Sequence, residues 1–200
     1  MTYLGEGGQI PYLNKQKIVD WAEEVFEEYY GERRFPVDVE EICDELGISI
    51  LPISGLAKAK RIDAFISMDF KSIYVDAYEY EKESNRYRFS VAHELGHYFL
   101  HRKYYPSNVN EAEKWIKISQ SILNNYAEFQ ANYFAGSLLV PEEELVRVLD
   151  CEFDGSFVRN YWNASSLELG RILAKVRKHF KVSDVVIARR MHDAFPGVEE

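Results

Sequence analysis

Apolar residues near the start of the chain recur at the spacing of a helix. Over residues 15–30 they gather on one side, with acidic residues on the other, which predicts an amphipathic helix. A second such pattern covers residues 37–46 and is followed by Gly47, a residue type that commonly ends a helix because it accepts a positive φ. The chain is therefore expected to begin with two helices that each bury one face.

Three short segments that follow are rich in β-branched and aromatic residues, as strands are. They cover residues 48–52, 62–68 and 72–77. The last two are separated only by Asp69-Phe70-Lys71, which predicts a hairpin. A small sheet is thus expected before the next helix.

A third helical segment carries polar residues within apolar surroundings. His93 and His97 are four residues apart, so on a helix they project from one face and can bind a single metal ion. Glu94 lies beside that ion, where it can take a proton from a zinc-bound water whose pKa the metal lowers from about 16 to roughly 7. The HExxH motif alone is a weak signal, but apolar residues flank it on both sides: Phe89, Val91, Ala92, Leu95, Tyr98, Phe99 and Leu100. In a helix so buried, unpaired imidazoles cost about 1 to 3 kcal/mol each, which metal binding removes.

A catalytic zinc site uses three protein ligands and keeps a further position open. His101 shares the face of His93 but lies roughly 12 Å along the axis of a straight helix, too far to bind the same ion. It is interpreted as a neighbour of the ligands or as a surface residue. Glu128, in a second helical segment, is the better third ligand, and Asn132 one turn later can orient a ligand imidazole. The alternative is that both are solvated polar residues.

Two stretches carry a resemblance to a known family. Residues 86–97 (RYRFSVAHELGH) and residues 128–141 (EFQANYFAGSLLVP) together resemble the ImmA/IrrE family of metallo-endopeptidases. The resemblance extends over roughly residues 15 to 145. Departures from the usual residues of the family fall outside the expected metal ligands, at Gly136, Ser137 and Val140.

The resemblance implies that His93, His97 and Glu128 bind one Zn²⁺ ion per chain and that Glu94 is the general base. It also implies a protein substrate, a transcriptional repressor or related regulator that is cleaved in response to a stress or mobile-element signal. The fold class expected is α+β, a zincin-like helical core with a small twisted β-sheet and a helical C-terminal subdomain.

Composition agrees with a cytoplasmic enzyme. A chain of 200 residues with 46% hydrophobic content can bury one good core. The start has no basic segment followed by an apolar one, and no uncharged apolar run reaches about 18 residues, so neither export nor membrane insertion is expected. Cys43 and Cys151 match no CxxC pattern and fit reduced thiols.

The end of the chain differs in charge from the rest. Residues 171–190 contain seven basic residues and one acidic residue, whereas the whole chain carries a formal charge of −9. The pattern is helix, turn, helix, with Ser183 as the N-cap of the second helix. We therefore divide the chain into a zinc metallopeptidase domain (residues 1–150) and a helix-turn-helix-like C-terminal subdomain (residues 151–200).

This C-terminal subdomain has two interpretations. It either packs as a lid on the peptidase core or binds DNA directly. The lid is favoured, because a single such unit in an acidic chain makes few phosphate contacts and would bind DNA weakly at physiological salt.

The function expected from the sequence is a zinc-dependent endopeptidase that cleaves a cytoplasmic protein. The alternatives are a non-catalytic zinc-containing regulator that binds a partner protein or DNA, and a zinc amidase with a non-protein substrate. Glu94 discriminates against the regulator, because a structural site needs ligands but no base. Peptide substrates of zinc peptidases pair with an edge strand, expected here along Ala64–Ser67 or Ile73–Asp76.

Overall fold

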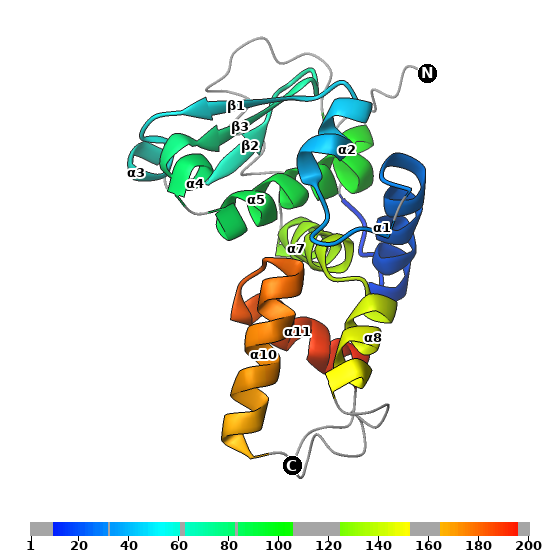
Figure 1. The fold of residues 1–200 in the computed structure, drawn as a ribbon. Coiled ribbons are helices and arrows are strands. Elements are labelled where there is room, and N and C mark those ends of the chain that lie inside the picture. The colour runs from blue at the N-terminus through cyan, green and yellow to red at the C-terminus, as the bar shows by residue number, and fades with distance from the viewer. Residues whose placement is uncertain are drawn as a thin grey trace.

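A computed structural model shows a small sheet at one end of the molecule, a group of helices at the other, and two long helices between them (Figure 1). The structure describes residues 10–31, 33–60, 63–82, 84–105, 125–152 and 165–195. Its α+β class is the one predicted from the sequence, because a helical body carries one three-stranded sheet.

The sheet consists of β1 (Ser49–Ile53), β2 (Ala64–Ile66) and β3 (Ser72–Asp76) in the order β1-β3-β2. β1 runs parallel to β3, and β2 forms an antiparallel hairpin with it, as predicted. The second strand is shorter than expected, and the predicted position Ile62 lies outside the described residues. Because β3 is central, the two edges of the sheet belong to β1 and β2.

The first two helices match the predicted ones closely. α1 (Lys15–Tyr29) begins after Asn14, whose side chain accepts a hydrogen bond from the backbone N–H of Lys17. α2 (Val39–Glu45) begins two residues later than predicted, because Asp38 is its N-cap and accepts from the N–H groups that follow. Gly47 has φ of +67° and ends the segment as expected.

Three other short helices, α3 (Leu56–Lys60), α4 (Ala77–Lys82) and the single 3₁₀ turn η2 (Arg102–Tyr104), were not predicted. They are 5, 6 and 3 residues long, too short for a helical pattern of apolar residues to stand out in the sequence. α4 follows directly on β3 and leads into the metal-binding helix.

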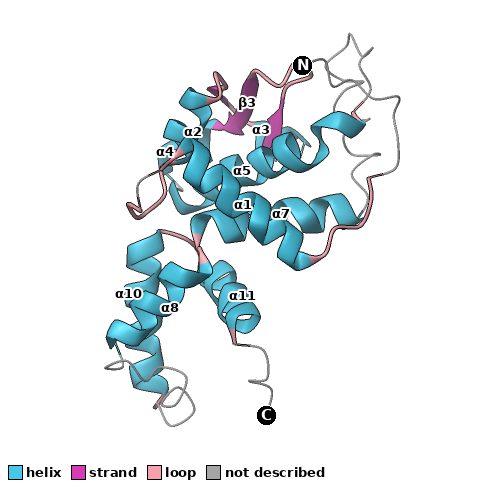
Figure 2. Cartoon of the chain, turned by 90° about the vertical axis from the view of Figure 1, so that its right-hand side faces the viewer, coloured by secondary structure: helices cyan, strands magenta, loops and turns pink. Residues whose placement is uncertain are grey.

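The two long central helices are α5 (Ser84–Gly96), which continues into the π-helical turn η1 (His97–His101), and α7 (Asn125–Leu139). Both carry the predicted metal-binding residues. They approach each other closely at Gly96, where an added Cβ would lie 3.0 Å from the Cα of Ala131. Figure 2 shows α1 beside this pair, and α1 packs along α7.

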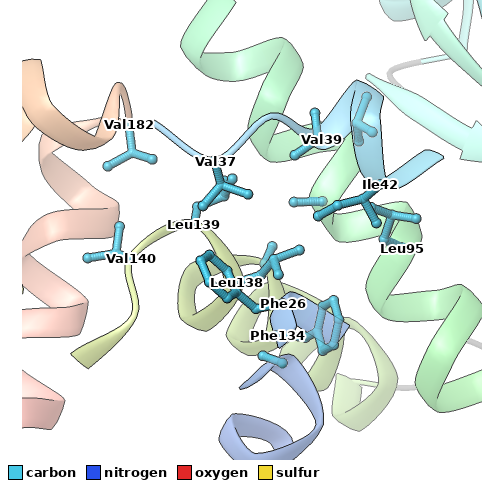
Figure 3. Close-up of a cluster of buried hydrophobic side chains, with 14 of the residues drawn as sticks. Phe26, Val37, Val39, Ile42, Leu95, Phe134, Leu138, Leu139, Val140 and Val182 are labelled. Atoms are coloured by element: carbon cyan, nitrogen blue, oxygen red, sulfur yellow. The ribbon is translucent and has the colours of Figure 1, made fainter. Parts of the chain in front are cut away.

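The helices that follow pack against the same core. They are α8 (Glu142–Glu152), α10 (Ser166–Phe180) and α11 (Asp184–Ala194). Val182 and Val140 lie beside Val37 and Leu139 in one continuous cluster of buried side chains (Figure 3). Arg88 of α5 donates to the carbonyl of Phe180, at the end of α10.

The predicted helix, turn, helix pattern is present in α10 and α11. Ser183 is the N-cap of α11, and Ser165 with Glu168 forms a capping box at the start of α10. The division into residues 1–150 and 151–200 stays a prediction. Within the described ranges, no helix is both long and apolar enough to cross a membrane.

Replacing Gly96 by Ala tests the close approach of α5 and α7. We expect the free energy of unfolding to fall by about 1 to 3 kcal/mol, because the added methyl group overpacks the contact with the Ala131 backbone. Chemical denaturation measures the change.

Gly170→Ala is the matched control for this substitution. Gly170 lies on the exposed side of α10 with no atom within 4 Å of an added Cβ. The same substitution should there raise stability, by up to about 1 kcal/mol, through helix propensity alone. Equal effects at both positions would contradict the assigned role of Gly96.

Candidate metal centre

Three predicted ligands lie together where η1 begins beside α7. The Nε2 atoms of His93 and His97 are 2.9 Å apart. One Glu128 carboxylate oxygen lies 3.4 Å from Nε2 of His93, and the other lies 3.5 Å from Nε2 of His97. Two imidazoles and a carboxylate from two helices therefore converge on one point.

These separations suit a zinc ion. Zinc–nitrogen and zinc–oxygen bonds of about 2.0–2.2 Å at tetrahedral angles place ligand atoms roughly 3.3–3.5 Å apart. The two distances to Glu128 fall at this value, and the distance between the two imidazoles is slightly shorter. The residues present thus fit a zinc ion held by His93, His97 and Glu128. That they bind zinc stays a prediction.

Electrostatics keep His97 and Glu128 in the protonation states that a metal requires. Burial lowers the pKa of His97 to about 3, so its imidazole is neutral at physiological pH. Burial alone would raise the pKa of Glu128, but hydrogen bonds from His93 and His97 outweigh it and hold the pKa below its ordinary value. The site therefore offers a neutral imidazole and an ionised carboxylate, which is the form in which both bind metals.

Glu94 lies next to the ligands without joining them. Its side chain is buried, and its Oε2 atom accepts a hydrogen bond of 3.0 Å from the backbone N–H of Ile66 in β2. Burial raises the pKa of Glu94 to about 7. The carboxylate is therefore fixed between the sheet and the metal-binding residues.

Asn132 contacts His93, one of the expected ligands, from the side. Its Oδ1 atom lies 3.2 Å from Nδ1 of His93. Since Nε2 of His93 points to the other ligands, Nδ1 carries the proton and donates it to Asn132. This hydrogen bond orients the imidazole.

His97 is supported by a longer chain of hydrogen bonds. Its Nδ1 atom lies 2.9 Å from Nδ1 of His101, and Nε2 of His101 lies 2.9 Å from Oε1 of Gln130. The Gln130 amide then donates to the carbonyl of Pro11. If Nε2 of His97 binds a metal, the tautomers of both histidines are fixed. His97 then carries its proton on Nδ1 and donates to His101, and His101 carries its proton on Nε2 and donates to Gln130.

The sequence allowed two interpretations of His101, as a neighbour of the metal ligands or as a surface residue. The surface position is wrong, because His101 is fully buried. It contacts His97 on the side away from the other ligands. The helix is not straight there, since residues His97–His101 form a π-helical turn, a feature frequent at functional sites.

The sequence did not predict that Gln130 and the Pro11 carbonyl support the site. Gln130 is two residues from Glu128, a spacing that places it on another side of the helix, so no ligand pattern includes it. Tyr105 was also missed. Its pKa is raised first by burial and then by the charges of Glu94 and Glu128, so this buried hydroxyl lies within the electric field of both carboxylates.

Comparison with known proteins adds one match. The sequence model of the peptidase M78 family, described as the IrrE N-terminal-like domain, matches residues 43–192. The matched region contains the three converging ligands, Glu94, the helix α10 and most of α11. No curated protein matches the chain.

Gln130→Met tests the chain of hydrogen bonds behind His97. The thioether cannot accept well from His101, so the His97 imidazole loses its fixed orientation and we expect zinc affinity to fall about 10- to 100-fold. Competition with a chromophoric chelator measures the affinity.

Gln130→Glu is the control for the bond to His101, because it keeps that acceptor while it loses the donor to Pro11, and it should retain zinc affinity. The thermal midpoint of the metal-free proteins shows whether either substitution affects folding instead. Equal zinc affinity for wild type and Gln130→Met would remove any role for the chain in metal binding.

Proposed function

Because the chain belongs to the peptidase M78 family, we propose that it is a zinc-dependent endopeptidase that cleaves a cytoplasmic protein. Membership makes it a metallopeptidase. The proposal goes beyond family membership in three respects: the metal is zinc, the enzyme is an endopeptidase, and the substrate is a cytoplasmic protein.

The position of Glu94 is the observation that carries the proposal. Among the residues that the structure describes, His93, His97 and Glu128 form the group that can hold a metal, and no fourth His, Cys, Asp or Glu joins them. A structural zinc site is closed by a fourth protein ligand, whereas a catalytic one is open and has a base beside it. Glu94 is held at that place by Ile66, which favours hydrolysis over the non-catalytic regulator.

The chemistry follows from the groups around the open position. A zinc ion bound here would lower the pKa of a coordinated water to about 7 and polarise the carbonyl of the scissile peptide bond. Glu94 accepts the proton from that water and delivers it to the leaving amine. Burial raises the pKa of Glu94 above its ordinary value, which suits a group that must take up a proton and give it back. Asn132 and His101 keep the two imidazoles in place during the reaction.

The edge of β2 is the proposed binding place for the substrate backbone. The carbonyl of Asp63 and the N–H of Ser67 bond to β3, so the backbone groups of Ala64 and Ile66 point away from the sheet. The N–H of Ile66 bonds to Glu94 on that side. A peptide added along Ala64 would therefore lie beside the base.

The alternative strand expected from the sequence, Ile73–Asp76, is wrong for this role. It forms β3, which is paired on both sides. The other edge, β1, contains Pro52, which has no N–H to offer a substrate.

The proposed substrate is a transcriptional repressor or related regulator, as the resemblance to the ImmA/IrrE family implies. Direct DNA binding is not favoured. Arg190, one of the basic residues of the C-terminal segment, is 2% exposed and donates to the carbonyl of Val140. A side chain so buried supports the lid interpretation, because it cannot reach the phosphate backbone of a DNA duplex.

Glu94→Gln tests the mechanism. The amide cannot accept the proton, so we expect zinc content to remain and kcat to fall about 10²- to 10⁴-fold. Bound zinc and cleavage of a repressor encoded beside this chain are measured together. Glu24→Gln, the same change on the exposed side of α1, should leave both unchanged. A Glu94→Gln protein that cleaves at the wild-type rate would refute the assignment of the base.

Ala64→Pro tests the substrate edge. Proline removes an N–H that points away from the sheet, a position where edge strands tolerate it, so we expect a higher KM with zinc and the thermal midpoint retained. Ala64→Ser, which keeps the N–H at similar size, should behave as wild type. If KM is the same for Ala64→Pro and wild type, the substrate does not pair with β2.

A further inference from the structure

A cavity of about 590 Å³ lies beside the metal centre, between α5, α7 and α11. Asn132 lines it and also contacts Nδ1 of the expected ligand His93, so the cavity lies beside one of the metal-binding residues. Its volume is that of a typical ligand pocket, enough for a side chain with its flanking backbone. The C-terminal helix α11 supplies one wall, with Ser183 at its start and Arg189 and Arg190 further along.

Three arginines line this cavity. Arg86, Arg189 and Arg190 contribute to it, and none of its described lining residues is an Asp or Glu. Arg86 is partly neutralised by carboxylates outside the lining, through ion pairs with Asp63 and Glu79. The whole chain has a net charge of −9, so the positive charge of this cavity comes from the local placement of its arginines and not from the composition of the chain.

Arg190 is a buried arginine in the wall of this cavity. Its side chain is 98% buried, and its Nε atom donates to the carbonyl of Val140. Its Nη1 atom is buried and has no hydrogen-bond partner among the described residues. Tyr133 lies under the guanidinium, 5.8 Å from ring centroid to Cζ. A buried charged donor without an acceptor is costly, and an anionic group in the cavity would supply one.

Two neighbouring features shape the cavity around Arg190. Gly136 has no side chain, and a Cβ there would lie 3.5 Å from Cδ of Arg190, so the arginine passes directly over the α7 backbone. The first turn of α11, from Ser183 to Val186, borders the cavity. The partial positive charge of a helix N-terminus adds to that of the arginines.

We propose that this cavity is a specificity pocket that takes an acidic side chain, Asp or Glu, of the peptide substrate close to the scissile bond. The proposal rests on the proposed endopeptidase function and names the class of sequence that it cuts. Arg189, which is exposed at the rim, and Arg190, at the wall, are the residues that select the charge.

The first experiment uses a fluorogenic peptide library in which one position at a time is fixed as Asp, Glu, Asn, Gln, Ala or Lys. We expect the zinc-loaded wild type to prefer Asp or Glu over Asn or Gln at one position near the cut by about tenfold or more in kcat/KM. Cleavage without any such preference overturns the pocket and leaves the endopeptidase function standing. A library that stays uncut overturns both.

Variants then assign the preference to the cavity. Arg189→Glu should abolish the preference for acidic residues or turn it toward Lys, while Lys178→Glu, the same charge change on the exposed side of α10, should keep it. Ser183→Asp places a carboxylate at the cavity in a residue type that is equally good as an N-cap, and should also weaken the preference. If Arg189→Glu and Lys178→Glu act alike, the effect is one of net charge and the proposal is wrong.

Binding provides a readout that does not depend on cleavage. In the Glu94→Gln protein, the Kd of the preferred acidic peptide should be about tenfold lower than that of its amide counterpart, and the difference should vanish when Arg189→Glu is added. Equal Kd values for the two peptides would overturn the proposal.

Discussion

The contact between α5 and α7 at Gly96 is the constraint on which the metal centre depends. His93 and His97 project from α5 and η1, whereas Glu128 projects from α7, so the three converge only if the helices lie close together. An added Cβ at Gly96 would meet the backbone of Ala131 at 3.0 Å, which leaves no room for a larger residue at unchanged separation. The glycine of the HExxH segment thus serves packing. It lies within α5 at ordinary helical angles, with no positive φ to accommodate.

Around this contact, distant parts of the chain support different groups of the site. β2 holds Glu94 through the N–H of Ile66, and the segment before α1 meets Gln130 through the carbonyl of Pro11. The C-terminal helix α11 meets α7 from another side, where Arg190 bonds to Val140. The base is therefore fixed by the sheet, and the support of His97 through His101 and Gln130 is anchored by the segment before α1, which is how such contacts keep the orientation of a site.

The sequence predicted the parts of this site that depend on local geometry. Residues four apart on one helix share a face in any fold, so spacing alone pairs His93 with His97, and Glu128 with Asn132. The edge position of β2 could not be predicted, because strand order is set by tertiary packing. The π-helical turn at His97–His101 leaves no mark in residue spacing, and neither does the contact of Gln130 with Pro11, 119 residues away.

The C-terminal helices show how one pattern suits two functions. An amphipathic pair joined by a short turn is typical of a DNA-binding unit, but the same pattern arises whenever two helices bury one face each against a core. Here Val182 and Ile187 are buried in the cluster that also contains Leu95 of the metal-binding helix. Arg190 is buried with them, and it lines the cavity beside Asn132. The positive charge of this segment is thus partly directed inward, toward the place where a substrate would lie, and the family match across both helices is consistent with a role for them in the site.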